Sequence, residues 1–420
     1  MASGFKLMDA FRSQVKKLKS KGVDSKAEFD VQYPTGFLAL DFLNGCMIHV
    51  ETDNINVTYN SIGIVDGSAN TFIGRSNCGK STLIMQTGAN IIRPFPMGKL
   101  YVDDIEGSLP QFRKEALFKF SKDELSDRVD IRNTGITTEN VYQRIKLIHD
   151  LKLENRDVFE YDTGLYDTEG NRIYKLQPTV YIIDSLPMLM PEDIATDDEL
   201  KGGMSAAQIA KSNTEIVKKI VQLNKEANII LFTINHILDD IQINPFAKKQ
   251  AQIAGLKEGE RLTGGKAAVY LANNMFRLDD VKMLKETEGF HIDGSVVEVT
   301  IIKSRTNRTR RSIPLIFNKT TGEFDNELSL YQLLKDNGRI GGAGAYMYLN
   351  VLPDTKFAQK NFKDILHTNT ELQKAFASEC YDVLKDFLSN MAVERFDENS
   401  TAFNINDLIL SSALQPAYAS

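Results

Sequence analysis

The chain has 420 residues, a formal net charge of -6 and 42% hydrophobic residues. The length exceeds that of one small domain and predicts a large core with smaller units, and the composition is typical of a globular protein. The negative net charge excludes a polycation, so any contact with nucleic acid must come from local basic surfaces.

The distribution of apolar residues and cysteines bears on the cellular compartment. No apolar run approaches the roughly 20 residues that cross a bilayer, and no secretory segment follows Met1, which predicts a protein without membrane contact. Cys46, Cys78 and Cys380 are scattered, which argues against a disulfide framework or a zinc site. We therefore expect a cytoplasmic, reducing setting.

Residues 1–33 begin the chain with a basic segment. Apolar residues recur in it at every third or fourth position between lysines, and this spacing predicts an amphipathic helix. Such a helix either packs on the core of its own chain with its charged face in solvent or docks on a neighbouring subunit. We expect an N-terminal helical arm that serves oligomerisation.

Residues 34–325 alternate between strand-like and helix-like patterns. Continuous apolar runs bounded by turns predict buried strands, and apolar residues three or four positions apart predict helices. This alternation predicts an α/β fold with a mostly parallel central sheet. The expected strands are 99–102, 128–132, 178–184 and 229–235, with helices at 108–121, 137–153 and 205–226. Hairpins are expected within 46–73 and 159–176, and three further strands within 268–318.

Residues 326–420 are expected to form a small C-terminal α-rich module. A helical pattern covers 366–391, and the glycine-rich run 341–345 predicts a flexible connector.

A phosphate-binding motif, Gly-Arg-Ser-Asn-Cys-Gly-Lys-Ser-Thr, follows a short apolar strand and precedes a helix-compatible stretch. Its two glycines allow the loop to wrap so that backbone N–H groups face an anion, and the helix dipole favours the same charge. Lys80 is placed to reach the β- and γ-phosphates and Ser81 to bind Mg²⁺. The motif predicts a nucleoside triphosphate site formed by Gly74, Arg75, Ser76, Asn77, Cys78, Gly79, Lys80, Ser81 and Thr82.

Two acidic strand ends complete the expected site. Asp184 ends a buried strand, where an acid can position Mg²⁺; the alternative is an Asp that caps a turn. Hydrolysis also needs a carboxylate that activates water, and the stretch after the strand at 99–102 supplies candidates. We choose Glu106 as the base, with Asp103 and Asp104 left open; the alternative is a solvated acidic turn.

Several further motifs occur in a fixed order along the chain. They are 104–106 with Pro110-Gln-Phe-Arg113, Ile183-Asp-Ser-Leu186, Thr233-Ile-Asn-His236, Leu262-Thr-Gly-Gly-Lys-Ala-Ala-Val-Tyr270 and Lys303-Ser-Arg305. Their order resembles that of RecA-family recombinases, closest to the UvsX-like recombinases of bacteriophages. Two departures stand out: the acid-to-proline spacing is one residue shorter than in the family, and Tyr270 replaces a phenylalanine.

The resemblance implies roles for individual residues. Glu106 would be the catalytic base, and Phe112 would stack on adenine. His236 would sense the γ-phosphate and pass its state to the DNA-binding loops. Lys303 and Arg305 would reach the ATP of the adjacent subunit. The basic run continues with Arg308, Arg310 and Arg311, for which the alternative interpretation is a solvated strand edge.

Two polar, aperiodic stretches are expected to bind DNA, one near 191–205 and one near 237–263. Cations and backbone amides can hold phosphates, and an apolar side chain can wedge between bases. The candidate DNA-binding residues are Gly202, Gly203, Phe246, Lys248, Lys249, Lys257, Arg261, Gly264 and Gly265.

Together, motif and resemblance imply a RecA-like P-loop ATPase core that uses ATP and Mg²⁺. The implied activity is that of a DNA-dependent ATPase forming a helical filament on single-stranded DNA and exchanging strands with homologous double-stranded DNA. Single-strand-binding and mediator proteins are further expected partners, and a phage origin would place the protein in the host cytoplasm. The alternatives are a DnaB-like ring helicase and an ATP-gated scaffold that coats single-stranded DNA.

Overall fold

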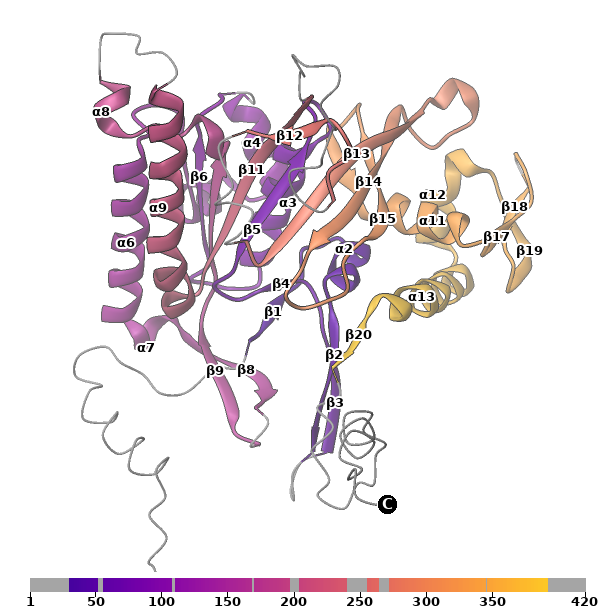
Figure 1. Cartoon of the computed structure of the whole chain (residues 1–420). Coiled ribbons are helices and arrows are strands. Elements are labelled where there is room, and N and C mark those ends of the chain that lie inside the picture. The colour runs from indigo at the N-terminus through magenta and orange to yellow at the C-terminus, as the bar shows by residue number, and fades with distance from the viewer. Residues whose placement is uncertain are drawn as a thin grey trace, which may run out of the picture.

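A computed structural model describes residues 30–51, 56–107, 110–167, 170–196, 204–239, 255–263, 272–344 and 346–391. The expected arm therefore lies outside the described residues except for its last four positions. Figure 1 shows a central twisted sheet with helices on both faces and smaller sheets at its periphery. None of the helices in the described ranges is both long and apolar enough to cross a membrane.

The described part of the central sheet contains ten strands. From β13 to β7 neighbouring strands run parallel, whereas β14, β15, β16 and the short β12 pair antiparallel with their neighbours. The expected largely parallel sheet is thus confirmed, with an antiparallel extension at one edge. In spatial order the strands are β16 (Glu323–Asp325), β15 (Arg311–Asn318), β14 (Gly294–Lys303), β13 (Asn274–Leu284), β5 (Ala69–Gly74), β11 (Ile229–Asp239), β10 (Thr179–Asp184), β6 (Lys99–Asp104) and β7 (Val129–Arg132), with β12 (Glu260–Leu262) on β11.

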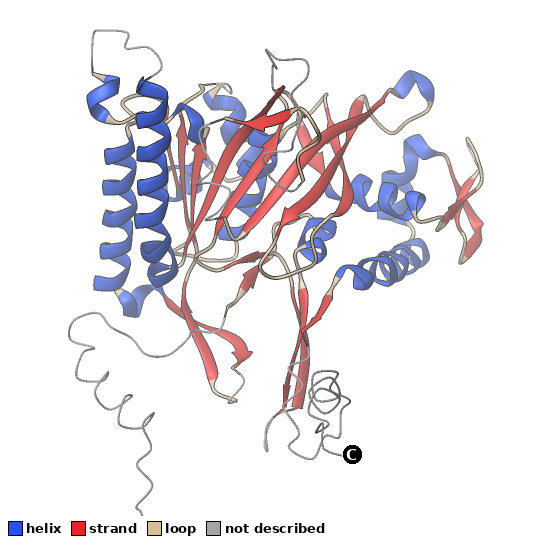
Figure 2. Ribbon diagram, viewed as in Figure 1, coloured by secondary structure: helices blue, strands red, loops and turns tan. Residues whose placement is uncertain are grey.

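Helices cover both faces of the parallel strands (Figure 2). Side chains alternate across a strand, so Val180 and Ile182 of β10 join the cluster that contains α3 (Lys80–Ile92) and α4 (Gln111–Phe118). Tyr181 and Ile183 join the opposite cluster with α6 (Thr138–Glu154) and α9 (Met204–Ala227). Burial on both faces explains why β10 is a continuous apolar run.

Local capping fixes where several helices begin. Ser121 and Glu124 form a reciprocal capping box at the start of α5 (Lys122–Arg128), and Thr137 and Asn140 form one at the start of α6. Asp325 caps α11 (Asn326–Asp336) by accepting a hydrogen bond from the Leu328 amide. The remaining α-helices of the described ranges are α2 (Leu38–Leu43), α7 (Arg156–Phe159), α8 (Glu192–Ala195), α12 (Phe362–Thr368) and α13 (Thr370–Leu384).

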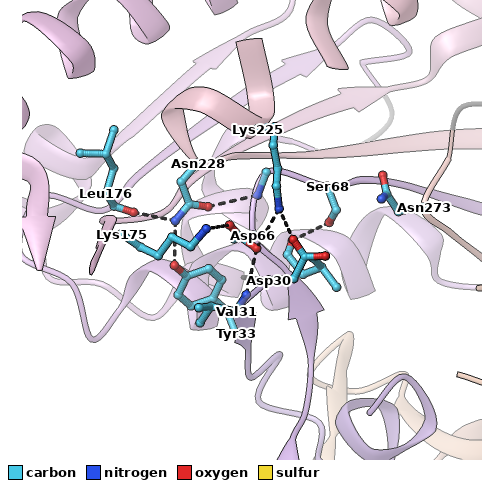
Figure 3. A network of polar contacts seen from close by, with 12 residues as sticks. Asp30, Val31, Tyr33, Asp66, Ser68, Lys175, Leu176, Lys225, Asn228 and Asn273 are labelled. Atoms are coloured by element: carbon cyan, nitrogen blue, oxygen red, sulfur yellow. Dashed lines mark hydrogen bonds and ion pairs between the residues drawn. The ribbon is translucent and has the colours of Figure 1, made fainter. Parts of the chain in front are cut away.

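A buried polar network closes the end of the sheet where the parallel strands begin (Figure 3). Asp66 is 1% exposed and lies 2.9 Å from Lys175 Nζ and 3.3 Å from Lys225 Nζ. The Asn228 amide donates to the Tyr33 hydroxyl at 2.7 Å and to the Leu176 carbonyl at 2.6 Å. These bonds hold the start of the described chain, the turn before β5 and the last residues of α9 together.

The smaller sheets test the remaining sequence predictions. Both expected hairpins are present, as β2 (Cys46–Glu51) with β3 (Asn56–Ser61) and β8 (Glu160–Tyr166) with β9 (Arg172–Leu176). The helical prediction for 366–391 is wrong at its end, because β20 (Ser389–Met391) pairs in parallel with β2. A two-stranded sheet joins β1 (Gln32–Tyr33) to β4 (Ile64–Val65), and a three-stranded one contains β17 (Ile340–Gly341), β18 (Met347–Leu349) and β19 (Leu352–Phe357).

The small sheet β17–β19 also departs from the expected connector at 341–345, since Gly341 lies in a strand. Met347 and Leu349 of β18 are buried in the same hydrophobic cluster as α11 and the central sheet, which attaches this small sheet to the rest of the fold. The domain boundary at residue 326 stays a prediction.

Candidate functional site

The parallel strands bring the predicted site residues to one edge of the sheet. β5 ends at Gly74, which pairs with His236 of β11 on one side and with Leu278 of β13 on the other. β10 and β6 end in paired acids, Asp184 beside Asp104. Residues that are far apart in sequence therefore meet at the carboxyl ends of the strands, where ligands bind in open α/β sheets.

The glycines of the phosphate loop are required by its geometry. Gly79 has a φ of 86°, in the left-handed region that disfavours side chains. A Cβ atom on Gly74 would lie 2.6 Å from the Leu278 carbonyl oxygen, so the close packing of β5 on β13 leaves no room for one.

Lys80 begins α3 and is 5% exposed. Its ammonium donates to two carbonyls of its own loop, Gly74 at 3.1 Å and Arg75 at 2.7 Å. These bonds hold the charge inside the loop, next to the positive end of the α3 dipole. The arrangement concentrates positive potential where the motif predicts the phosphates.

A cavity of about 440 Å³ opens beside the loop. It joins the loop to the ends of β6 and β11, so two predicted catalytic side chains and the phosphate loop line one space. Its lining residues are Ser76, Asn77, Gly79, Lys80, Ser81, Thr82, Glu106, His236 and Phe317.

Asp184 has the environment expected of a metal ligand. It is 1% exposed, and neither carboxylate oxygen reaches a hydrogen-bond partner of regular geometry among the described residues. Burial raises the pKa of Asp184 to about 7, although the nearby Ser81 hydroxyl acts in the opposite direction. A buried carboxylate and a neighbouring hydroxyl are hard oxygen ligands, which suits Mg²⁺.

Glu106 is held by two partners at the cavity. The Ser185 hydroxyl donates to its Oε1, and His236 Nε2 lies 2.7 Å from the same oxygen. Burial alone would raise the pKa of Glu106, but the bonds from Ser185 and His236 and the charge of Lys80 outweigh it, so the pKa is lowered. Glu106 is therefore ionised at neutral pH.

The two neighbouring acids are occupied elsewhere. Asp104 is fully buried and lies 2.5 Å from the equally buried Lys114 ammonium. Asp103 accepts two hydrogen bonds from the Arg132 guanidinium, at 2.9 and 3.1 Å. Of the three carboxylates left open by the sequence, Glu106 is the one that lines the cavity.

Three other predicted site residues lie outside the cavity. The Phe112 side chain is 74% exposed on α4 and does not line it. Lys303 pairs with Met275, which pairs with Thr71, so Lys303 lies toward the start of β5 and away from the phosphate loop. Arg305 follows in an exposed loop beyond the end of β14.

The candidate DNA-binding residues are mostly outside the described ranges. Lys257 and Arg261 are described, and Arg261 lies on β12, paired with Leu238 of β11. The remaining predictions, which fall outside the described residues, are Gly202, Gly203, Phe246, Lys248, Lys249, Gly264 and Gly265.

Sequence reasoning missed three contributors to the site. Ser185 directly follows Asp184, so a polar residue after the acid that is predicted to bind Mg²⁺ was a usable signal. Phe317 reaches the cavity from β15, and nothing local in the sequence marks it. Asp239 forms a two-bonded ion pair with Arg75 of the phosphate loop, at 3.1 and 2.5 Å.

Comparison with known proteins supports a phosphate-loop nucleotide-binding ATPase. The chain is 24% identical over 204 residues to the energy-coupling factor transporter ATP-binding protein EcfA2 of Clostridium acetobutylicum. The match spans 45% of this chain and 65% of that protein, which is less than two thirds of the relative. No protein-family model matches the chain.

Proposed function

We propose that this protein is an ATP-dependent recombinase of the RecA type. It would form a helical filament on single-stranded DNA, pair that strand with a homologous duplex and exchange strands in recombination and repair. The proposal rests on the ordered motifs in the sequence and on the way in which the folded chain distributes them.

One observation carries the proposal. Lys80, Glu106 and His236 line one cavity, whereas the register of β13 and β14 puts Lys303 toward the opposite end of the strands. Lys303 and Arg305 therefore could serve a nucleotide only across a contact between copies of the chain. A head-to-tail contact of that kind repeats into a ring or a helical filament.

The cavity residues would divide the work of hydrolysis. The loop amides and Lys80 would hold the phosphates, and Asp184 with Ser81 would hold Mg²⁺. When bound, Mg²⁺ would neutralise charge on the β- and γ-phosphate oxygens. Glu106 would orient the attacking water and accept its proton. His236 would meet the γ-phosphate, and its position on β11 links the cavity to the stretch that follows Asp239.

The transporter subunit to which the chain is similar suggests a second candidate, an ATPase that drives transport. Single-stranded DNA separates the two, because a recombinase should hydrolyse ATP faster when DNA is present. Electron microscopy with ATP and single-stranded DNA would distinguish a filament from a helicase ring. A strand-exchange assay would then distinguish a recombinase from a scaffold that only coats DNA.

Lys80→Ala should lower ATP turnover by about 100-fold or more, because it removes the cation that contacts the transferred phosphoryl group. The matched control is Lys99→Ala, which removes a lysine at the start of β6 that pairs with Asp127. Turnover by Lys80→Ala at the level of the control would refute the assignment of the loop.

The contact between copies has its own test. Lys303→Ala with Arg305→Ala should be inactive, and mixing this variant with Lys80→Ala should restore about a quarter of the sites, since each supplies the half that the other lacks. Full activity of the double variant alone, or no recovery on mixing, would refute the shared site.

A further inference from the structure

The phosphate loop is tied to the end of β11 by the side chain of Arg75. Its two terminal nitrogens contact both carboxylate oxygens of Asp239, at 3.1 and 2.5 Å. Paired contacts of this kind fix the plane of a guanidinium, which a single contact does not. Asp239 is also the principal cause of the raised pKa of Arg75, through this hydrogen bond.

The backbone of Arg75 connects this ion pair to Lys80. The Arg75 carbonyl accepts the shortest hydrogen bond of the Lys80 ammonium to a loop carbonyl, at 2.7 Å. Arg75 thus has its side chain fixed by Asp239 and its carbonyl on the lysine that the motif assigns to the phosphates. A change in the position of Arg75 would move the Lys80 charge.

Asp239 is itself held in place by buried contacts. It is the last residue of β11 and pairs with Glu260 of β12. Glu260 is 5% exposed, and its carboxylate receives two bonds from the Arg277 guanidinium, at 2.5 and 2.9 Å. Arg277 also bonds Asp279 at 2.7 Å. These buried contacts already fix the backbone at Asp239, so little backbone entropy is lost when its side chain pairs with Arg75.

We propose that Asp239 is a positioning residue for the phosphate loop, acting through Arg75 on Lys80. The ion pair holds the loop in a shape that receives phosphate, so its first effect is on nucleotide affinity. This inference rests on the proposed nucleotide-binding function and adds a residue that lies outside the phosphate-loop motif.

The size of the effect is set by exposure. The side chains of Arg75 and Asp239 are 56% and 68% exposed, so solvent and salt screen the pair. We expect Asp239→Asn to raise the Kd for ADP with Mg²⁺ about threefold at low salt. Asp239→Arg, which adds repulsion, should raise it about tenfold. Both effects should shrink at high salt, where the wild type loses the same attraction.

Calorimetric titration of the full-length chain with ADP and Mg²⁺ tests the proposal. Asp239→Glu, which keeps the carboxylate, should bind within about twofold of the wild type. Both Kd and kcat should change, because Lys80 would hold the phosphates and also contact the transferred phosphoryl group. Asp127→Asn is the control, since Asp127 is also 68% exposed and pairs with Lys99.

Unchanged affinity in Asp239→Asn, or a loss in Asp239→Glu as large as that in Asp239→Asn, would overturn the positioning role. A separate arm tests the underlying function with Lys80→Ala. If that variant binds ADP as the wild type does, the proposed nucleotide site fails. If it loses binding while Asp239→Asn does not, only the role of Asp239 fails.

Discussion

The two ends of the central sheet treat a buried carboxylate in opposite ways. At the end where the strands begin, Asp66 is 1% exposed and has two lysines within 3.3 Å (Figure 3). At the end where they finish, Asp184 is also 1% exposed, and no described residue gives it a hydrogen bond of regular geometry. The two carboxylates are therefore equally buried, but only the charge of Asp66 is balanced by neighbouring lysines among the described residues.

This difference suggests different roles for the two carboxylates, one in stability and one in binding. A buried charge costs several kcal/mol unless it is paired, so Asp66 with its lysines stabilises one conformation of the fold. The charge of Asp184 lacks such a partner, and its pKa is raised to about 7 as a result of burial. We infer that Asp184 is suited to receive a cation, and that the fold tolerates the cost for that reason.

The largest expected effect is the loss of stability on breaking the compensated end. Asp66→Ala should lower the free energy of unfolding by about 3–5 kcal/mol, because it leaves the buried ammonium of Lys175 without its carboxylate. Urea denaturation would measure this. Asp127→Ala, which breaks an ion pair with a 68% exposed carboxylate, should cost less than about 1 kcal/mol. Equal losses in the two variants would contradict the contrast.

The second effect concerns the uncompensated end. Asp184→Asn should lower ATP turnover about 100-fold or more, while the melting temperature stays equal or rises, because the amide carries no charge to desolvate. Turnover assays and thermal unfolding of the ligand-free protein would test both parts. A lower melting temperature would show that the carboxylate stabilises the fold even without a cation.

The smallest expected effect concerns His291. It tests whether an ionisable side chain that lies inside the fold without a hydrogen-bond partner must have a function. The centroid of the His291 ring lies 4.8 Å from that of Tyr331 and 5.9 Å from that of Phe362. Neither ring nitrogen has a hydrogen-bond partner in the described chain. Burial, with a smaller contribution from Lys335, lowers the pKa of His291 to about 4. We expect no role for it in turnover.

The sign of the pH effect follows from the two states. Below the unfolded pKa of about 6.5 the unfolded chain takes up a proton at His291 that the folded chain refuses until about pH 4. The free energy of unfolding should therefore decrease as the pH is lowered from about 6.5 to about 4. His291→Phe should make this decrease smaller by about 1–2 kcal/mol. Denaturation of both proteins at pH 7 and pH 4.5 would measure the difference. Identical pH dependence, or lost turnover at pH 7, would refute this assignment.

Much of the central sheet could be predicted because its signals are local. The run 178–184 is apolar and ends in an acid, and the structure has a strand at Thr179–Asp184, one residue shorter than predicted. The phosphate loop was equally visible, since its glycines and lysine are contiguous. Burial on both faces and a tight loop leave their physical requirements in neighbouring residues.

The contacts that complete the site were not predictable in this way. Ser185 and His236 both reach Glu106, and Phe317 reaches the cavity from a strand at the antiparallel edge. Each contact depends on strand register, which hydrophobic pattern alone does not determine between segments so far apart. The wrong prediction at β20 has a related origin. Its three residues are too few to show a hydrophobic period, and they form a strand because they pair with β2.

The pairing of β20 with β2 also bears on how the protein folds as it is synthesised. β2 lies between β3 and β20, so its outer edge stays open from the time that the hairpin emerges until almost all of the described chain has been made. An unpaired strand edge is a template for wrong pairing with another chain. The edge of β2 therefore stays unpaired with β20 during most of translation, and it stays so in a nascent chain that stops before Ser389.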